Sequence, residues 1–210
     1  MARITGPKCR LCRREGMKLF LKGERCHTVK CAVEKRGTPP GMRTWSRARR
    51  SSYGMQLREK QRLKRMYGVM EKQFRIYFGR AVQTKGNTGD NLLLEVERRL
   101  DNVLRASGFG LGPASSRQIV GHGHTFVNGK RCDRPSRQVR VGDLISITDH
   151  ERKRKHVKNA SEAAPSFLGE TPAWLEVDRE KMEIRVIALP TREQFPFEIN
   201  EQLIVEGMAK

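Results

Sequence analysis

The stretch RLDNVLRASGFG (residues 99–110), followed by SSRQIVGHGHTFVNGKRCDRPSRQVRVGDLISI (residues 115–147), decides the fold of the middle of this chain. The first part repeats apolar residues at helical spacing, and Pro113 stands where the first residue of a second, short helix is expected. Asn128-Gly129 lies between two short runs typical of strands, which is the strongest short signal for a β-hairpin. Two helices followed by small strands predict an α+β fold.

Further elements are expected on both sides of this unit. Helical spacing predicts three long helices, over residues 51–67, 69–84 and 91–107, with Ser51 or Ser52 capping the first and Asp90 the third. Later elements are expected as strands over 138–141 and 144–148, a hairpin over 173–187, and a last helix over 200–207. The charge run ERKRKHVK (151–158) is expected to be a solvated link.

The charge of the chain points to a polyanionic partner. Its 210 residues include 43 Lys and Arg against 23 Asp and Glu, a net charge of +20. Residues 1–158 hold 38 basic and 13 acidic side chains, whereas residues 159–210 hold 5 and 10. Solubility alone needs a net charge of roughly 2–8, so nucleic acid is the expected partner. We expect no membrane partner and a cytoplasmic location, because no apolar run could span a bilayer and no secretory signal follows Met1.

Four cysteines near the start have the spacing of a metal site. Cys9, Cys12, Cys26 and Cys31 form the pattern C-x2-C and C-x4-C, and flanking Lys and Arg favour the thiolate form. Four thiolates leave no open position for water, so a structural zinc site is expected. A four-iron-four-sulfur cluster uses the same ligands, and His27 could replace Cys26. Disulfides fit badly with a chain that has no export signal.

Basic and polar residues in three regions are candidate RNA contacts. Proteins recognise double-stranded RNA mainly through its backbone shape and 2′-hydroxyls, which requires cations held at fixed positions. The candidates are Arg43, Arg47, Arg49 and Arg50 in an irregular arm, Arg58, Lys60, Arg62 and Arg65 in the first long helix, Ser115, Ser116, Arg117 and Gln118 at the start of the short helix, and His122, His124, Asn128, Lys130 and Arg131 around the hairpin. Ser115 could also be an ordinary cap, and the two histidines could serve packing.

Residues 99–110 and 115–147 closely resemble the RNA-binding module of small-subunit ribosomal protein four. The same module occurs in some tyrosyl-tRNA synthetases, pseudouridine synthases and heat-shock proteins. Other stretches resemble the bacterial-type members of that ribosomal protein family: MARITGPKCRLCRREG (1–16), YGMQLREKQRLKRMYGVMEKQF (53–74), GNTG (86–89), WLEVD (174–178) and INEQLIVEG (199–207). The resemblance therefore extends over nearly the whole chain.

The resemblance implies a structural role in the small ribosomal subunit. Family members bind a multi-helix junction in the 5′ domain of small-subunit ribosomal RNA, nucleate assembly, contact small-subunit protein five and line the path by which messenger RNA enters. The resemblance also implies that the chain is not an enzyme and not a homo-oligomer. Its expected parts are a four-cysteine module (1–36), a basic arm (37–50), a helical lobe (51–90), the RNA-binding module (91–158) and a C-terminal segment that returns to the helical lobe (159–210).

Two other function classes are compatible with the same module. A free RNA-binding regulator of translation is one alternative. An RNA-modifying enzyme is the other, but it needs a catalytic domain for which the residues after 158 are too few, and no Walker, GxSxG or HExxH motif occurs. Two features depart from the family pattern: several members lack the four cysteines, and residues 184–200 are more apolar than usual.

Overall fold

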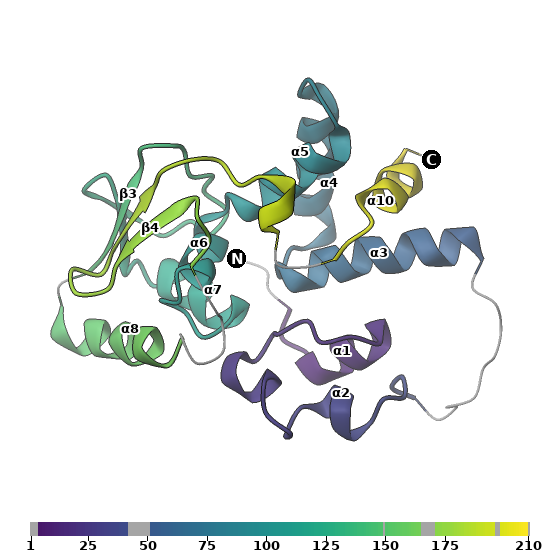
Figure 1. The fold of residues 1–210 in the computed structure, drawn as a ribbon, viewed down its shortest axis with the longest axis horizontal. Coiled ribbons are helices and arrows are strands. Elements are labelled where there is room, and N and C mark those ends of the chain that lie inside the picture. Colours follow the sequence, from purple (N-terminus) through teal and green to yellow (C-terminus); the bar gives the residue numbers. More distant parts are fainter. Residues whose placement is uncertain (1–3, 42–50, 149, 165–170, 196–197, 210) are drawn as a thin grey trace. The chain divides into compact units, whose positions relative to one another are not determined.

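The structure is a computed structural model that describes residues 4–41, 51–148, 150–164, 171–195 and 198–209. The chain divides into two compact units. The first unit comprises Met1–Leu93 and Phe197–Lys210, and the second comprises Leu94–Pro196 (Figure 1). No helix within the described ranges is long and apolar enough to cross a membrane.

The first unit is helical. Its elements are α1 (Lys8–Glu15), the 3₁₀ helix η1 (Gly23–Cys26), α2 (Ala32–Lys35), α3 (Ser52–Met66), α4 (Glu71–Gln83), the start of α5 (Thr88–Glu97) and α10 (Glu201–Met208). The predicted cap of α3 is confirmed, because the Oγ atom of Ser51 accepts a hydrogen bond from the Gly54 N–H at 3.1 Å. The core of this unit is made by apolar side chains of α3, α4 and α5, such as Leu63, Phe74 and Leu92.

The C-terminal helix α10 packs on α3 within the first unit (Figure 1). Two glycines allow close approaches of α10, one to α3 and one to α5. A Cβ atom on Gly207 would lie 2.9 Å from the Cβ of Gln56 in α3, and one on Gly89 would lie 2.6 Å from the Cγ of Glu201. The Nε2 atom of Gln56 also donates a hydrogen bond to the Oε2 of Glu206 at 3.2 Å. The last helix is therefore an integral part of the first unit although it is remote in sequence.

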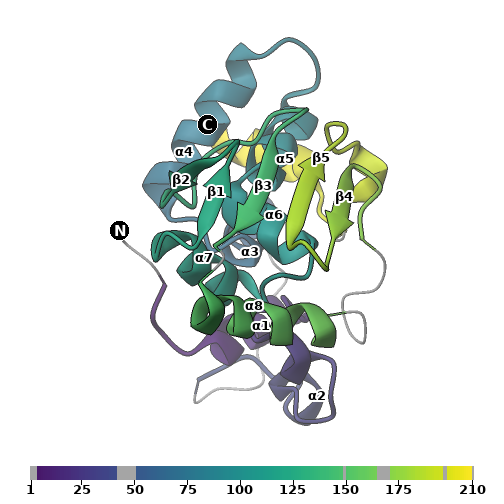
Figure 2. The same ribbon diagram turned by 90° about the vertical axis from the view of Figure 1, so that its left-hand side faces the viewer.

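The second unit combines an antiparallel sheet with helices, so the predicted α+β class is confirmed. Figure 2 shows its five strands in the order β2-β1-β3-β5-β4. The strands are β1 (Thr125–Val127), β2 (Lys130–Cys132), β3 (Leu144–Ile147), β4 (Leu175–Asp178) and β5 (Glu183–Val186). The helices are α6 (Leu100–Ala106), α7 (Pro113–Gly121) and α8 (Glu151–Ala163), and a short 3₁₀ helix, η2 (Arg192–Gln194), follows β5.

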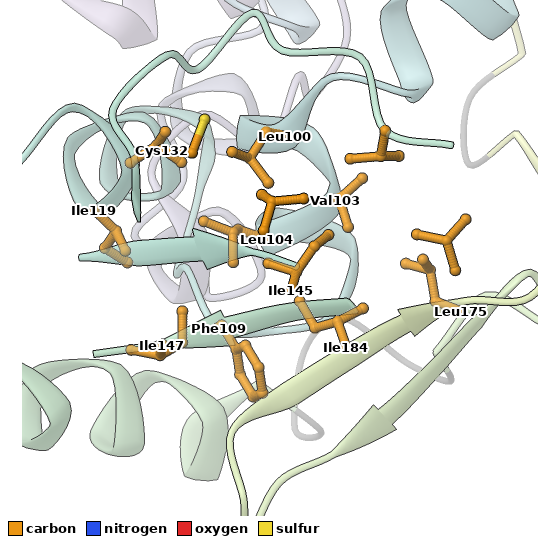
Figure 3. Packing of buried hydrophobic residues seen from close by; sticks show 14 of the residues in the cluster. Leu100, Val103, Leu104, Phe109, Ile119, Cys132, Ile145, Ile147, Leu175 and Ile184 are labelled. Atoms are coloured by element: carbon orange, nitrogen blue, oxygen red, sulfur yellow. The ribbon is translucent and has the colours of Figure 1, made fainter. Parts of the chain in front are cut away.

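The core of the second unit lies between the sheet and its helices. Leu100, Val103 and Leu104 of α6 project towards Ile145 of β3 and Ile184 of β5 (Figure 3). Each of these five side chains is fully buried. Because β4 and β5 contribute to this core, the sheet joins the 125–147 hairpin region to a later segment of the chain.

The structure corrects two predictions in this region. The helix predicted over 91–107 is two helices, because Arg99 between α5 and α6 is extended and forms a β-bridge with Gln138. The Val139 N–H donates to the Arg98 carbonyl at 2.9 Å, so residues 98–99 pair with a distant segment instead of continuing the helix. The strand predicted over 138–141 is reduced to that single bridge.

The segment after residue 150 also differs from the prediction. The charge run 151–158 is not a solvated link but the first part of α8, in which Val157, Ala160 and Ser161 are buried. Strands β4 and β5 belong to the second unit, and only the last residues belong to the first. The expected C-terminal segment 159–210 is therefore divided between the two units, and α10 is the part that packs on α3.

Candidate nucleic-acid interface

The start of α7 contains four of the predicted contact residues, and they face different surroundings. Ser116 is fully buried, and its Oγ donates to the Gly112 carbonyl at 3.2 Å. Ser115 and Arg117 are half-buried, and Gln118 is exposed. The N-cap residue of α7 is Gly112, which has no side chain to cap the first turn. The residues that can meet a ligand at this end of α7 are therefore Ser115, Arg117 and Gln118, whereas the Ser116 side chain serves the fold.

Arg117 belongs to a cluster with two buried partners. Arg99 is only 1% exposed, and its Nε and Nη2 atoms donate to the two carboxylate oxygens of Asp101 at 2.9 and 2.6 Å. The Nη1 of Arg117 also lies 3.4 Å from Oδ2 of Asp101. Asp101 thus holds one arginine inside the unit and orients a second one at its surface, since a carboxylate can accept several charge-assisted bonds.

His122 and His124 lie beside Arg131. Their rings meet edge to face with centroids 5.7 Å apart. The Arg131 guanidinium donates to the Gly123 carbonyl at 3.1 Å and to the His122 carbonyl at 3.4 Å. A Cβ on Gly123 would lie 2.3 Å from the Arg131 Nε, and its φ of +67° also favours glycine. Arg131 therefore fixes this loop, while its side chain stays exposed to a ligand.

The tip of the β1–β2 hairpin is fixed by Asn128. Its Nδ2 donates to Asp143 Oδ1 at 2.8 Å, and its Oδ1 accepts from the Leu144 N–H at 2.9 Å. Asn128 adopts a φ of +52°, as the predicted Asn-Gly turn requires. The neighbouring Lys130 is exposed and has no ion-pair partner among the described residues. The tip thus presents an available cation on a braced turn.

The four predicted contact residues of α3 are all ion-paired. Glu15 of α1 receives both Arg58, at 3.2 Å, and Arg65. Lys60 and its neighbour Lys64 lie 3.0 and 2.7 Å from the carboxylate oxygens of Glu71. Arg62 pairs with Glu59 within the helix. Lys64 and, to a smaller extent, Lys60 lower the pKa of Glu71 from 4.5 to about 2. The helix therefore presents positive charge that is partly neutralised.

Sequence reasoning missed three exposed arginines, Arg134, Arg137 and Arg140, in the loop after β2. Their side chains have no ion-pair partner in the part of the chain that the structure describes. The Pro135 and Arg137 carbonyls accept hydrogen bonds from the first N–H groups of α6, at 3.2 and 2.9 Å, which holds the loop in place. The signal was present in the sequence as the basic stretch RPSRQVR (134–140). The predicted Arg43, Arg47, Arg49 and Arg50 lie outside the described residues.

The four predicted metal ligands line one common cavity of the first unit. Cys9, Cys12, Cys26 and Cys31 all line one small cavity of about 20 Å³, and all are free thiols. His27, the alternative ligand, does not line that cavity and instead stacks on Phe20 with ring centroids 4.8 Å apart. Within the described ranges, no group of three or more His, Cys, Asp or Glu side chains is arranged to hold a metal ion. The expected zinc site is thus not shown.

The pKa of two of these cysteines shifts in the direction opposite to the expectation. Flanking lysines and arginines were expected to favour thiolates. In the structure, burial raises the pKa of the Cys12 and Cys26 thiols, and the neighbouring cysteines add to the effect. At these two thiols, burial therefore outweighs the cationic surroundings.

Comparison with known proteins assigns the family. Residues 3–97 match the ribosomal protein S4/S9 N-terminal domain, and residues 98–145 match the S4 domain. The chain belongs to the ribosomal protein S4 family. The border between the two matches coincides with the break between α5 and α6. The S4-family resemblance of the sequence is thereby confirmed.

Full-length relatives agree with this assignment. The small ribosomal subunit protein uS4 of Pelobacter propionicus is 51% identical over 210 residues, and the match covers all of both chains. The uS4A protein of Alkaliphilus oremlandii is 53% identical and the uS4 protein of Solidesulfovibrio magneticus 52% identical, again over the whole of each chain. The S4-family match therefore includes the C-terminal segment with β4, β5 and α10.

Proposed function

We propose that this chain is a structural protein of the small ribosomal subunit that binds ribosomal RNA in the cytoplasm and catalyses no reaction. The observation that carries the proposal is the end-to-end similarity to proteins named small ribosomal subunit protein uS4. The S4 domain at residues 98–145 and the net charge of +20 support RNA as the partner.

The proposed mode of binding is recognition of RNA shape through the phosphate backbone. Exposed cations on braced loops, such as Lys130 and Arg134, can meet phosphates without first breaking an ion pair. Arg117 and Arg131 are held in defined orientations by hydrogen bonds, which reduces the entropy lost on binding. Aromatic residues make up only 6% of the chain, so base stacking contributes little.

The proposed RNA target is a helix junction in the 5′ domain of small-subunit ribosomal RNA, bound early in assembly. The proposed neighbours are small-subunit protein five and the messenger RNA near the path by which it enters. Family membership supports these finer assignments. The predicted contact residues of the 37–50 arm, of α3, of the α7 start and of the hairpin remain our proposed contacts, joined by Arg134, Arg137 and Arg140.

We further propose a structural zinc ion bound by Cys9, Cys12, Cys26 and Cys31. The support is that all four side chains line the same cavity and that four sulfur donors suit zinc. Zinc would close the loop that joins the two cysteine pairs. Elemental analysis of the purified chain should give one zinc per chain, and Cys12→Ser should remove it. Iron and sulfide in place of zinc would support the cluster alternative. If the purified chain contained neither zinc nor iron, both the zinc site and the cluster would be excluded.

Co-sedimentation tests the proposed function. Small ribosomal subunits purified in high salt should contain one copy of this chain, because a structural component stays bound through many contacts. A tagged chain should also assemble into new subunits. Its absence from salt-washed subunits, together with binding to a particular messenger, would instead favour a free translational regulator.

A further inference from the structure

Glu15, the last residue of α1, lies at a junction inside the first unit. Its side chain is 0% exposed. The Oε1 atom of Glu15 accepts a hydrogen bond from Arg58 Nη1 at 3.2 Å and another from Arg65 Nη1. The two arginines are seven residues apart and therefore lie on one face of α3, two turns apart. A single buried carboxylate thus joins the cysteine-bearing segment to the basic helix.

Burial makes this contact different from an ordinary surface ion pair. A buried carboxylate is costly unless cations and hydrogen bonds compensate it, and here two guanidinium groups do so. The second oxygen, Oε2, is buried and has no hydrogen-bond partner among the described residues. The carboxylate therefore depends on its two arginines and restrains both of them.

The two arginines keep donors available while they bind Glu15. A guanidinium has five N–H groups, and in each arginine the bond to Glu15 uses Nη1. The side chains of Arg58 and Arg65 remain 23% and 18% exposed. Each guanidinium can therefore bind the buried carboxylate on one side and an RNA phosphate on another.

We propose that Glu15 is a positioning residue for RNA binding, which holds Arg58 and Arg65 in the orientation that two phosphates require. This inference rests on the proposed function. Because both guanidiniums are fixed before RNA arrives, less side-chain freedom is lost on binding. A merely electrostatic account predicts the opposite effect, since neutralising Glu15 would raise the net positive charge and strengthen RNA binding.

The experiment compares matched variants of the full-length chain. Glu15→Gln and Glu34→Gln each remove one negative charge, but Glu34 is exposed and pairs with Lys18, which is not one of the proposed RNA contacts. Affinity for the 5′-domain junction RNA is measured between low and moderate salt. We expect Glu15→Gln to bind about tenfold more weakly than the unmodified chain. The salt dependence should also become shallower, by about 0.7–0.9 in log–log slope for each phosphate that the variant no longer neutralises. Glu34→Gln should bind equally well or more tightly.

A second variant separates positioning from folding. Glu15→Asp keeps the charge but withdraws the carboxylate by one methylene, and circular dichroism at the assay temperature checks that its helices are intact. We expect this folded variant to bind several-fold more weakly. Equal affinity of Glu15→Asp and the unmodified chain, or tighter binding by Glu15→Gln with an unchanged slope, would overturn the inference. If the unmodified chain itself binds the junction without salt dependence, it is the proposed function that fails.

Discussion

The basic residues of α3 and those of the loop after β2 carry the same charge but differ in burial and in ion pairing. In α3, Arg58, Lys60, Arg62 and Arg65 are all paired with carboxylates and partly buried. In the loop, Arg134 and Arg137 are exposed, and they have no ion-pair partner among the described residues. The helix therefore holds cations that the fold also uses, whereas the loop holds cations that are available to a ligand.

This difference shows that charge density does not measure RNA-binding capacity. A paired arginine is pre-oriented, but its carboxylate competes with the phosphate. An unpaired arginine is available, but it loses more conformational freedom when it binds. Substitutions in the helix should therefore affect stability as well as affinity, and substitutions in the loop should affect affinity almost alone.

The largest expected effect concerns Asp101, which ties two cations of the second unit to the fold. Asp101→Asn removes the carboxylate charge that faces the buried Arg99 guanidinium. We expect a loss of about 3–5 kcal/mol in the free energy of unfolding, measured by urea denaturation. Asp133→Asn, at an exposed position, should change stability by less than about 0.5 kcal/mol. Equal effects of the two variants would show that carboxylate pairing is not structural here.

Substitutions at two glycines test whether the packing of α10 on α3 stabilises the first unit. Gly207→Ala places a methyl group 2.9 Å from the Gln56 Cβ and should destabilise the first unit by about 1–3 kcal/mol. Gly79→Ala in α4 meets no atom within 4 Å and should stabilise by up to about 1 kcal/mol, because alanine favours a helix more than glycine. Thermal melting compares the two. Similar shifts in both variants would contradict the close approach of α10.

Two double variants test the difference between the paired cations of α3 and the unpaired cations of the loop. Arg134→Ala with Arg137→Ala should weaken junction binding about tenfold, with an unchanged melting temperature, because these side chains have no ion pair in the described part of the chain. Lys60→Ala with Lys64→Ala should weaken binding less and lower the melting temperature, because Glu71 is deprived of both lysines. Binding assays and melting curves on the same samples decide. A larger loss of affinity in the α3 variant, or a lower melting temperature in the loop variant, would contradict the difference between helix and loop.

The smallest effect is the pH dependence of the Glu71 pairs. Lys64 and Lys60 lower the pKa of Glu71 to about 2, so the pairs stabilise the fold above about pH 5 and lose this effect as the pH falls towards 2. Glu71 is 36% exposed, so the effect should stay below about 1 kcal/mol. The difference in melting temperature between the unmodified chain and Glu71→Gln should shrink between pH 6 and about 2.5. A constant difference would mean that Glu71 does not contribute through its charge.

Local signals made the centre of the fold predictable from the sequence. Pro113 marked the start of α7, Asn128-Gly129 marked the hairpin, and Ser51 marked the cap of α3. Each signal acts within a few residues, so it needs no knowledge of the rest of the chain.

Long-range pairing explains what the sequence did not reveal. The break at Arg99 depends on Gln138, and the pairing of Arg65 depends on Glu15, fifty residues earlier. The helix α8 did have a signal, since Val157, Ala160 and Ala164 are buried at helical spacing, but the high charge of the segment obscured it. For the interface, residue types identify the cations of the chain, but which of them are ion-paired depends on the tertiary fold.

The salt dependence of binding tests the central claim, that folded cations recognise the phosphate framework of ribosomal RNA. Affinity of the full-length chain is measured across a range of salt concentrations, for the 5′-domain junction and for a scrambled duplex of equal length. We predict a steep linear fall of log affinity with log salt concentration and clearly tighter binding to the junction at every salt concentration. A flat plot, or equal affinity for both RNAs, would contradict the account.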